Sequence, residues 1–277
     1  MKFPSAQRSP FPINDTVWAH LYLPAGADKP ACVLLLPVMA APNLWIETRF
    51  INRLVANGLA VLLVEMPYQF HRSPGTLIPS GEVFLARSPK RMAANFRQSI
   101  ADARRALDWL EASEYVDSKR IGVLGISLGA IVGSMVLSQD NRPRGGILLL
   151  GGADFPSLVV NSVMTRDVVW HSHLKIPEMR RAWKGIEPGE YREKNRGKNV
   201  FLINVHSDAI IQAENARKLK EAFPDAEQWW LPLGHYTAML HIVWVPSYIA
   251  WKFKRILGGR AEDGAGNRAA TGCRSGP

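Results

Sequence analysis

Residues 121–129 read Ile-Gly-Val-Leu-Gly-Ile-Ser-Leu-Gly, an apolar strand pattern that runs directly into a serine flanked by glycines. The small, apolar residues that follow, Ala130–Ser138, predict a helix. The segment Gly125–Gly129 therefore has the G-x-S-x-G pattern of a sharp strand-to-helix turn that lifts a serine hydroxyl out of a sheet. The glycines have a steric role, because a side chain at position 125 or 129 would collide with the neighbouring strand or helix.

The rest of the chain alternates between strand-like and helical patterns. Val17–Leu23 alternates apolar and polar residues, which predicts a strand of an early antiparallel hairpin. Further strands are expected at Ala31–Leu36, Leu59–Val64, Gly146–Leu150, Asn199–Val205 and Glu227–Leu231, and helices at Leu44–Asn57, Pro89–Ala112, Ala213–Ala222 and Tyr236–Leu257. Such alternation predicts an α/β fold with a mostly parallel sheet and helices on both faces.

Two of these helices contain a proline with a positional meaning. Ser88 suits the N-cap of the long helix, and Pro89 suits its first turn. Pro246 falls inside the pattern Tyr236–Leu257, where proline removes a backbone donor and should kink or interrupt the helix.

The expected domain organisation is one α/β domain over residues 1–257 with a disordered tail at 258–277. Residues 152–198 lie between two predicted strands and contain tryptophans, histidines and many charges. We interpret this segment as a helical cap insertion, because insertions at such places lie over the carboxyl edge of the strands, where open α/β sheets bind ligands. Pro67–Arg87 is a second excursion, rich in Pro, Gly and Ser.

The composition is that of a globular protein, with 47% hydrophobic and 21% charged residues. The net charge is +10, but the basic residues are scattered apart from those at 252–277. No nucleic-acid-binding motif accompanies them, so a solvated basic surface is the favoured interpretation. Only two cysteines occur, Cys32 and Cys273, which argues against a disulfide framework. No secretory or membrane-spanning run is found, and we expect a cytoplasmic protein with no integral membrane segment.

Three polar residues form a candidate catalytic triad. Ser127 needs a base, and His235 follows the last predicted strand directly after Gly234. The base needs a carboxylate, and Asp208 comes just after the strand Asn199–Val205. The chain order Ser127, Asp208, His235 is that of α/β-hydrolases. Asp154, which follows another predicted strand, is the rival triad acid.

These motifs resemble the α/β-hydrolase fold superfamily of serine hydrolases from about Ala31 to the terminal helix. The region Asp117–Gly129 is similar to the corresponding region of dienelactone-hydrolase-like and prolyl-oligopeptidase-like members. The segment Glu65–Tyr68, with Arg72 and Pro74 after it, loosely resembles a less studied hydrolase-domain subgroup.

The resemblance implies an oxyanion hole made of two backbone N–H groups. One belongs to Leu128, the residue after the nucleophile. The other comes from the loop after Ala31–Leu36, which here reads Pro37-Val38-Met39 where many members carry His-Gly. Alignment of Pro37-Val38 with His-Gly makes Met39 the second donor, with Val38 as the alternative.

The triad predicts a serine hydrolase that acts through an acyl-enzyme intermediate, and the resemblance implies a carboxylesterase with a small-molecule ester as substrate. A peptidase, thioesterase or lactonase could use the same triad. A non-catalytic binding or regulatory protein of this fold is the alternative of a different class, because the loop at 37–39 departs from the family pattern. No cofactor and no nucleic-acid partner is expected. No metal site is expected either, because His171 and His173 have no supporting carboxylate or cysteine cluster.

Overall fold

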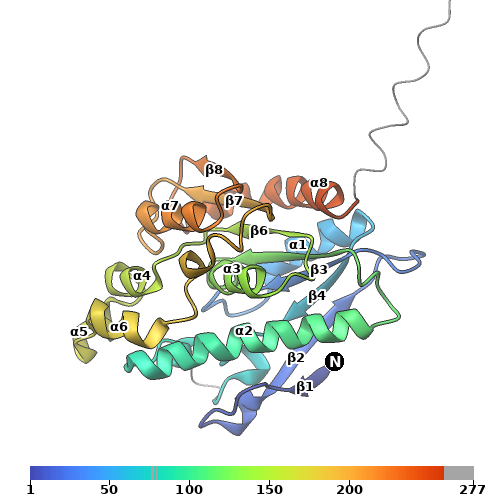
Figure 1. The fold of residues 1–277 in the computed structure, drawn as a ribbon. Helices are drawn as coiled ribbons and strands as arrows, with labels where there is room; N and C mark the ends of the chain where they lie inside the picture. The colour runs from blue at the N-terminus through green and yellow to red at the C-terminus, as the bar shows by residue number, and fades with distance from the viewer. Residues whose placement is uncertain (76–77, 79, 259–277) are drawn as a thin grey trace, which may run out of the picture.

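The computed structural model describes residues 1–75, 78 and 80–258. In this part of the chain, eight strands form one sheet in the order β1-β2-β4-β3-β5-β6-β7-β8 (Figure 1). The strands are β1 (Lys2–Pro4), β2 (Thr16–Tyr22), β3 (Cys32–Leu36), β4 (Ala60–Val64), β5 (Ile121–Ile126), β6 (Gly145–Leu149), β7 (Asn199–Val205) and β8 (Glu227–Leu231). Strands β3 to β8 pair in parallel, whereas β2 is antiparallel to both β1 and β4. The predicted α/β class is confirmed.

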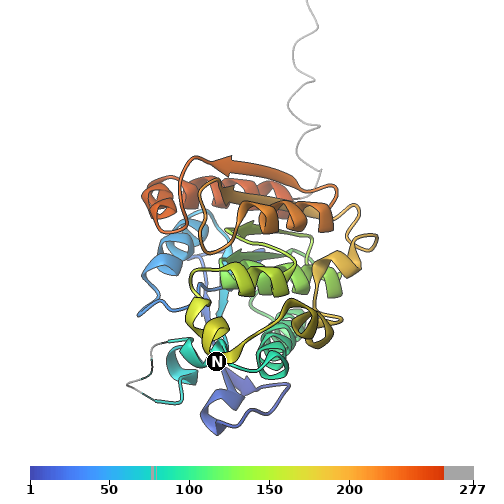
Figure 2. The ribbon, with the colours of Figure 1, turned by 90° about the vertical axis from the view of Figure 1, so that its left-hand side faces the viewer.

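Helices cover both faces of the sheet (Figures 1 and 2). Successive strand residues point to opposite faces, so that Leu34 packs in one apolar core and Val33 and Leu35 pack in the other. The first core contains residues of α2 (Pro89–Ala112), α3 (Leu128–Gln139) and α7 (Ala213–Ala222). The second contains residues of α1 (Trp45–Ala56) and α8 (Val245–Gly258). Burial on both faces explains why the central strands are continuously apolar.

The segment between β6 and β7 is helical, as the sequence predicts. It contains α4 (Phe155–Asn161), α5 (Arg166–Ser172), α6 (Ile176–Trp183) and the 3₁₀ helix η4 (Pro188–Tyr191). Trp183 is fully buried with its ring 5.8 Å from that of Phe96 on α2. The Arg97 guanidinium of α2 donates to the Ala182 carbonyl at 2.7 Å. The insertion is therefore attached to α2, and its role as a cap over a substrate stays a prediction.

The interruption expected at Pro246 is confirmed. The pattern Tyr236–Leu257 is divided between the 3₁₀ helix η5 (Thr237–Val243) and α8, and Pro246 lies in the first turn of α8, where its missing N–H costs nothing. Three details differ from the sequence expectations. Ser88 is at the N-cap of α2, but its side chain makes no capping hydrogen bond. Strand β1 has no predicted counterpart. Gly258 is helical, and the rest of the predicted tail lies outside the described residues.

The remaining 3₁₀ helices are η1 (Pro12–Asp15), η2 (Phe70–Arg72) and η3 (Glu82–Phe84). In the described ranges, none of the helices has both the length and the apolar character that crossing a bilayer requires.

Candidate active site

The turn between β5 and α3 presents Ser127 at the carboxyl edge of the sheet. Ser127 has φ 53° and ψ −113°, a region that is sparsely populated by residues other than glycine. Its N–H donates to the Leu149 carbonyl at 2.8 Å, and its own carbonyl accepts from the N–H groups of Ala130 and Ile131. The surrounding backbone thus holds a conformation that costs about 1–3 kcal/mol in isolation.

The two glycines allow this turn to pack at backbone distance from its neighbours. A Cβ atom on Gly125 would lie 2.3 Å from the Gly129 carbonyl oxygen. A Cβ atom on Gly129 would lie 2.0 Å from the Leu36 carbonyl oxygen and 2.8 Å from that of Pro37. All three distances are below van der Waals contact, which confirms the steric role expected from the sequence. Gly129 also fixes the turn directly against the loop that follows β3.

A continuous chain of hydrogen bonds joins Ser127, His235 and Asp208. His235 Nε2 lies 3.1 Å from Ser127 Oγ, and His235 Nδ1 lies 2.8 Å from Asp208 Oδ2. The three residues come from the ends of three parallel strands: Ser127 follows β5, Asp208 follows β7 and His235 follows β8. Because parallel strands end at the same edge of a sheet, residues far apart in sequence meet there.

The local backbone orients the acid and the histidine. Asp208 Oδ1 accepts hydrogen bonds from the N–H groups of Ile210 and Ile211, both at 2.8 Å, which leaves Oδ2 for the imidazole. His235 lies in a turn closed by two bonds, from the Gly234 N–H to Thr237 Oγ1 and from the Ala238 N–H to the Gly234 carbonyl. The side chains of Asp208 and His235 are only 3% and 11% exposed. Their interaction is therefore shielded from water.

Asp154, the rival triad acid, has other partners. Its carboxylate lies 2.7 Å from Lys218 Nζ and 3.3 Å from an Arg180 guanidinium nitrogen. The hydrogen bond with Asp154 raises the pKa of Lys218. Among the described residues, the carboxylate that contacts the His235 ring is Asp208.

The loop after β3 is fixed by two buried side chains that the sequence analysis missed. The Val38 N–H donates to Glu47 Oε1 at 3.0 Å, and the Val38 carbonyl accepts from Gln69 Nε2 at 2.9 Å. The Val38 N–H thus already has an acceptor, which favours Met39 over Val38 as the second oxyanion donor. Among the described residues, the N–H groups of Met39 and Leu128 have no protein acceptor.

Glu47 is a fully buried carboxyl group on α1. Burial raises its pKa, and the hydrogen bond from Val38 opposes that rise. Its second oxygen, Oε2, has no hydrogen-bond partner in the described part of the chain. The available signal was an acidic residue on the apolar face of a predicted helix, next to Phe50 and Ile51. That signal marks a buried carboxyl group but does not identify what it binds.

A small apolar cavity adjoins the imidazole. Its volume is about 60 Å³, and its lining includes Phe50, Ile126, Leu231 and His235. Because one water needs roughly 10–15 Å³ on such a measure, the cavity can hold a small apolar group. A larger hollow of about 740 Å³ lies around Asp154, away from the hydrogen-bonded chain at Ser127.

His206, His171 and His173 lie outside the chain of hydrogen bonds at Ser127. His206 is exposed and stacks on Trp230, with ring centroids 5.2 Å apart. His171 and His173 are also exposed, and neither belongs to a group of potential metal ligands within the described residues.

Comparisons with known proteins identify the fold. No family model matches the chain, and no curated protein matches it.

Among solved structures, the PEG-bound cold-adapted esterase from an Arctic intertidal metagenomic library is 17% identical with a TM-score of 0.62, over 91% of this chain and 92% of that chain. Pyrococcus horikoshii acylaminoacyl peptidase is 13% identical with a TM-score of 0.67, over 93% and 40% of the respective chains. The ferulic acid complex of Est1E from Butyrivibrio proteoclasticus is 14% identical with a TM-score of 0.65, over 88% and 96%. The chain therefore has the α/β-hydrolase fold, as its motifs indicate.

Proposed function

We propose that this protein is a serine hydrolase that cleaves carboxylic esters through an acyl-enzyme intermediate. The observation that carries the proposal is the hydrogen-bonded chain from Asp208 through His235 to Ser127. A serine hydroxyl is a weak nucleophile by itself and needs an adjacent base. In this geometry, His235 Nε2 is within reach of the Ser127 proton, and Asp208 holds Nδ1–H so that Nε2 is the free acceptor.

The reaction follows from the positions of these groups. Ser127 Oγ attacks the ester carbonyl carbon while His235 removes its proton. The carbonyl oxygen becomes an oxyanion, which the N–H groups of Leu128 and Met39 stabilise, each by about 3 kcal/mol. His235 then gives its proton to the departing alcohol, which leaves an acyl group on Ser127. A water activated by His235 hydrolyses this acyl-enzyme, so that a carboxylic acid leaves and the serine is restored.

Two further observations favour an ester substrate of modest size. The structural neighbours include proteins described as esterases, among them the Arctic enzyme and an acetyl xylan esterase. The apolar cavity beside His235 has room for a small acyl or alcohol group. Peptides, thioesters and lactones remain substrates that the same triad could attack, and a panel of these compounds measures the preference.

A fluorophosphonate probe tests the proposal directly, because it reacts only with an activated serine. The wild-type protein should be labelled at one site, which peptide mass spectrometry identifies as Ser127. Labelling and hydrolysis of p-nitrophenyl esters should disappear in Ser127→Ala. Ser207→Ala is the matched control, since Ser207 is exposed beside Asp208 and should not affect labelling. Failure of the folded wild-type protein to react would refute the proposal and favour a binding protein with this fold.

A further inference from the structure

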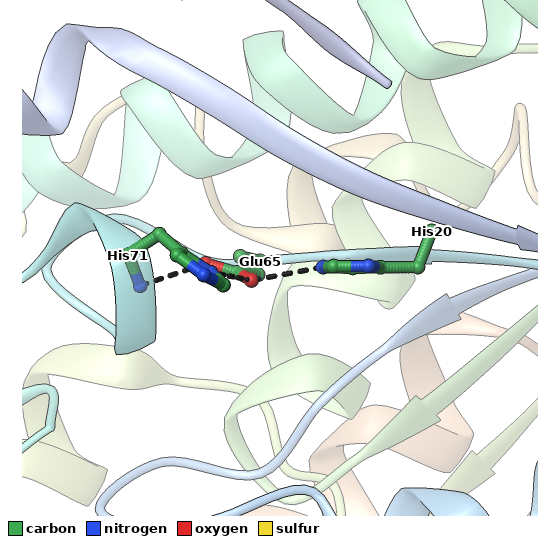
Figure 3. Close-up of side chains that lie close together, drawn as sticks. All are labelled: His20, Glu65 and His71. Carbon is green, nitrogen blue, oxygen red and sulfur yellow. Dashed lines mark hydrogen bonds and ion pairs between the residues drawn. The ribbon is translucent and has the colours of Figure 1, made fainter.

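A second histidine–carboxylate group lies on the other side of β3 from Ser127. It consists of His20 on β2, Glu65 directly after β4 and His71 in η2, here called the His20–Glu65–His71 cluster (Figure 3). The two imidazoles approach the Glu65 carboxylate from opposite sides. Glu65 Oε1 lies 3.0 Å from His20 Nε2 and 2.7 Å from His71 Nδ1. One potential ligand atom from each residue lies within 4.8 Å of the other two.

The fold fixes the backbone positions of all three residues. In the antiparallel pair of β2 and β4, His20 is opposite Leu63, and the Glu65 N–H continues the ladder by donating to the Trp18 carbonyl at 2.9 Å. Arg72 follows His71 directly and is fully buried. Its guanidinium donates to the Glu65 carbonyl at 2.9 Å, which ties the backbone beside His71 to that of Glu65. The cluster is therefore assembled by the fold itself, before any ligand arrives.

The side chains are also oriented by their neighbours. The His71 N–H donates to Glu65 Oε2 at 3.0 Å, which holds the carboxylate in place. The Trp18 ring stacks on the His71 ring at 4.0 Å with an interplanar angle of 13°. Such contacts, made by groups that do not themselves bind a metal, orient the ligands in metal sites.

Access differs between the carboxylate and the imidazoles. The Glu65 side chain is 1% exposed, whereas those of His20 and His71 are 33% and 52% exposed. The carboxylate is buried, yet the imidazole edges reach solvent, so an ion can enter without unfolding of the surrounding structure.

We infer that His20 Nε2, His71 Nδ1 and a Glu65 carboxylate oxygen form a Zn²⁺-binding site. Two imidazoles and one carboxylate are a ligand set that zinc uses, with water in the remaining position. Calcium and magnesium are disfavoured because they prefer oxygen ligands. Zinc also has no geometric preference from its d electrons, so small shifts of these side chains suffice to accommodate it.

Zinc at this site would join β2 to the segment that carries η2. That segment includes Gln69, whose side-chain amide donates to the Val38 carbonyl in the loop after β3, next to the turn that carries Ser127. The ion would thus act as a structural cross-link at some distance from Ser127, and it would take no part in the ester chemistry.

Isothermal titration of chelator-treated protein with Zn²⁺ tests the site. All titrations use protein with the substitution Cys273→Ser, which removes a thiol that could compete for zinc; the Cys32 thiol is buried and needs no substitution. With His20, Glu65 and His71 unchanged, this protein should bind one ion per chain, and Co²⁺ should give the intense visible absorption of a four-coordinate site. His71→Phe keeps a ring on Trp18 but removes a ligand, so its affinity should fall on the order of 100-fold or more. His206→Phe is the matched control, since His206 is also exposed and stacked on a tryptophan, and it should bind normally.

Glu65→Gln provides a second variant in case His71→Phe does not fold. An amide can hydrogen-bond to both imidazoles after they change tautomer, but it is a poor zinc ligand, so the folded variant should also lose the ion. Absence of binding in the wild type, or binding that survives in both variants while they are folded by circular dichroism, would refute the zinc site. The cluster would then be a hydrogen-bonded contact only.

Discussion

The described part of the chain contains two centres in which a buried carboxylate contacts imidazole. At the first, Asp208 contacts one histidine, and the far nitrogen of that ring faces the Ser127 hydroxyl at 3.1 Å. At the second, Glu65 contacts two histidines through one oxygen. Both carboxylates also accept backbone N–H groups, two at Asp208 and one at Glu65.

The two centres differ in the third group that completes them. At the first centre it is a hydroxyl next to the second nitrogen of the imidazole, and at the second centre it is another imidazole on the same carboxylate. A carboxylate that fixes the tautomer of a single histidine makes its other nitrogen a base for a hydroxyl. A carboxylate between two histidines brings three potential metal ligands together, and no serine lies beside them. The same residue types then form a candidate metal site or a structural contact. A carboxylate–histidine contact alone therefore does not identify a catalytic centre.

Removal of His235, the proposed base at the first centre, should have the largest effect. We expect His235→Ala to lower kcat for a p-nitrophenyl ester on the order of 10⁶-fold, because the serine loses its proton acceptor. Steady-state kinetics measures the loss, and His206→Ala serves as the control. Turnover within tenfold of the wild type would mean that His235 is not the base.

An amide in place of Asp208, the proposed triad acid, should have the next largest effect. Asp208→Asn should fold, yet kcat should fall by about 10⁴-fold, because an amide can stabilise the wrong tautomer of His235. Asp154→Asn should keep near wild-type turnover, since Asp154 pairs with Lys218 and Arg180. If the two variants showed the reverse order, Asp154 would be the acid.

At the second centre, exchange of the Glu65 carboxylate for an amide should change the stability little, whereas removal of the carboxylate should lower it clearly. Glu65→Ala leaves the backbone N–H of His71 and both imidazoles without the buried carboxylate that they contact, and we expect the free energy of unfolding to fall by about 2–3 kcal/mol. Glu65→Gln should lose much less, because its amide can serve both the N–H and the switched imidazoles. Chemical denaturation in the presence of a chelator measures both. Equal losses in the two variants would contradict this account of the cluster.

The smallest effect concerns Glu47, a third buried carboxyl group that contacts no histidine. Its raised pKa means that the folded protein favours the protonated form. The contribution to stability is full below the ordinary pKa of a glutamate and is lost as the pH rises through the folded value. Glu47→Gln should keep the bond to Val38 and abolish this loss, so that its unfolding free energy depends less on pH than that of the wild type. Glu221→Gln, at an exposed position, is the control.

The sequence predicts the fold and the meeting of distant residues because both depend on periodic patterns and short motifs. Apolar runs marked the buried strands, and glycine spacing marked the turn at Ser127. Once the strands are parallel, the positions of Asp208 and His235 just after two strands place both at the edge that carries Ser127.

The missed features depend on pairings that no local pattern encodes. His20 meets Glu65 only because β2 lies antiparallel beside β4 in one register, and His71 arrives through an irregular loop. The acceptor for the Val38 N–H comes from a helix residue nine positions later, and its chemistry depends on burial. A histidine or glutamate met alone in the sequence gives no sign of such partners.

The close approach at Gly129 has a consequence for how this protein could change over generations. The turn that carries Ser127 touches the carbonyl groups of Leu36 and Pro37 with no side chain between them. The spacing of the two loops is thus set by main chain, which mutation alters far less readily than it alters side chains. Residues lining the neighbouring cavity can therefore change over generations while the spacing between Ser127 and the loop after β3 is inherited intact.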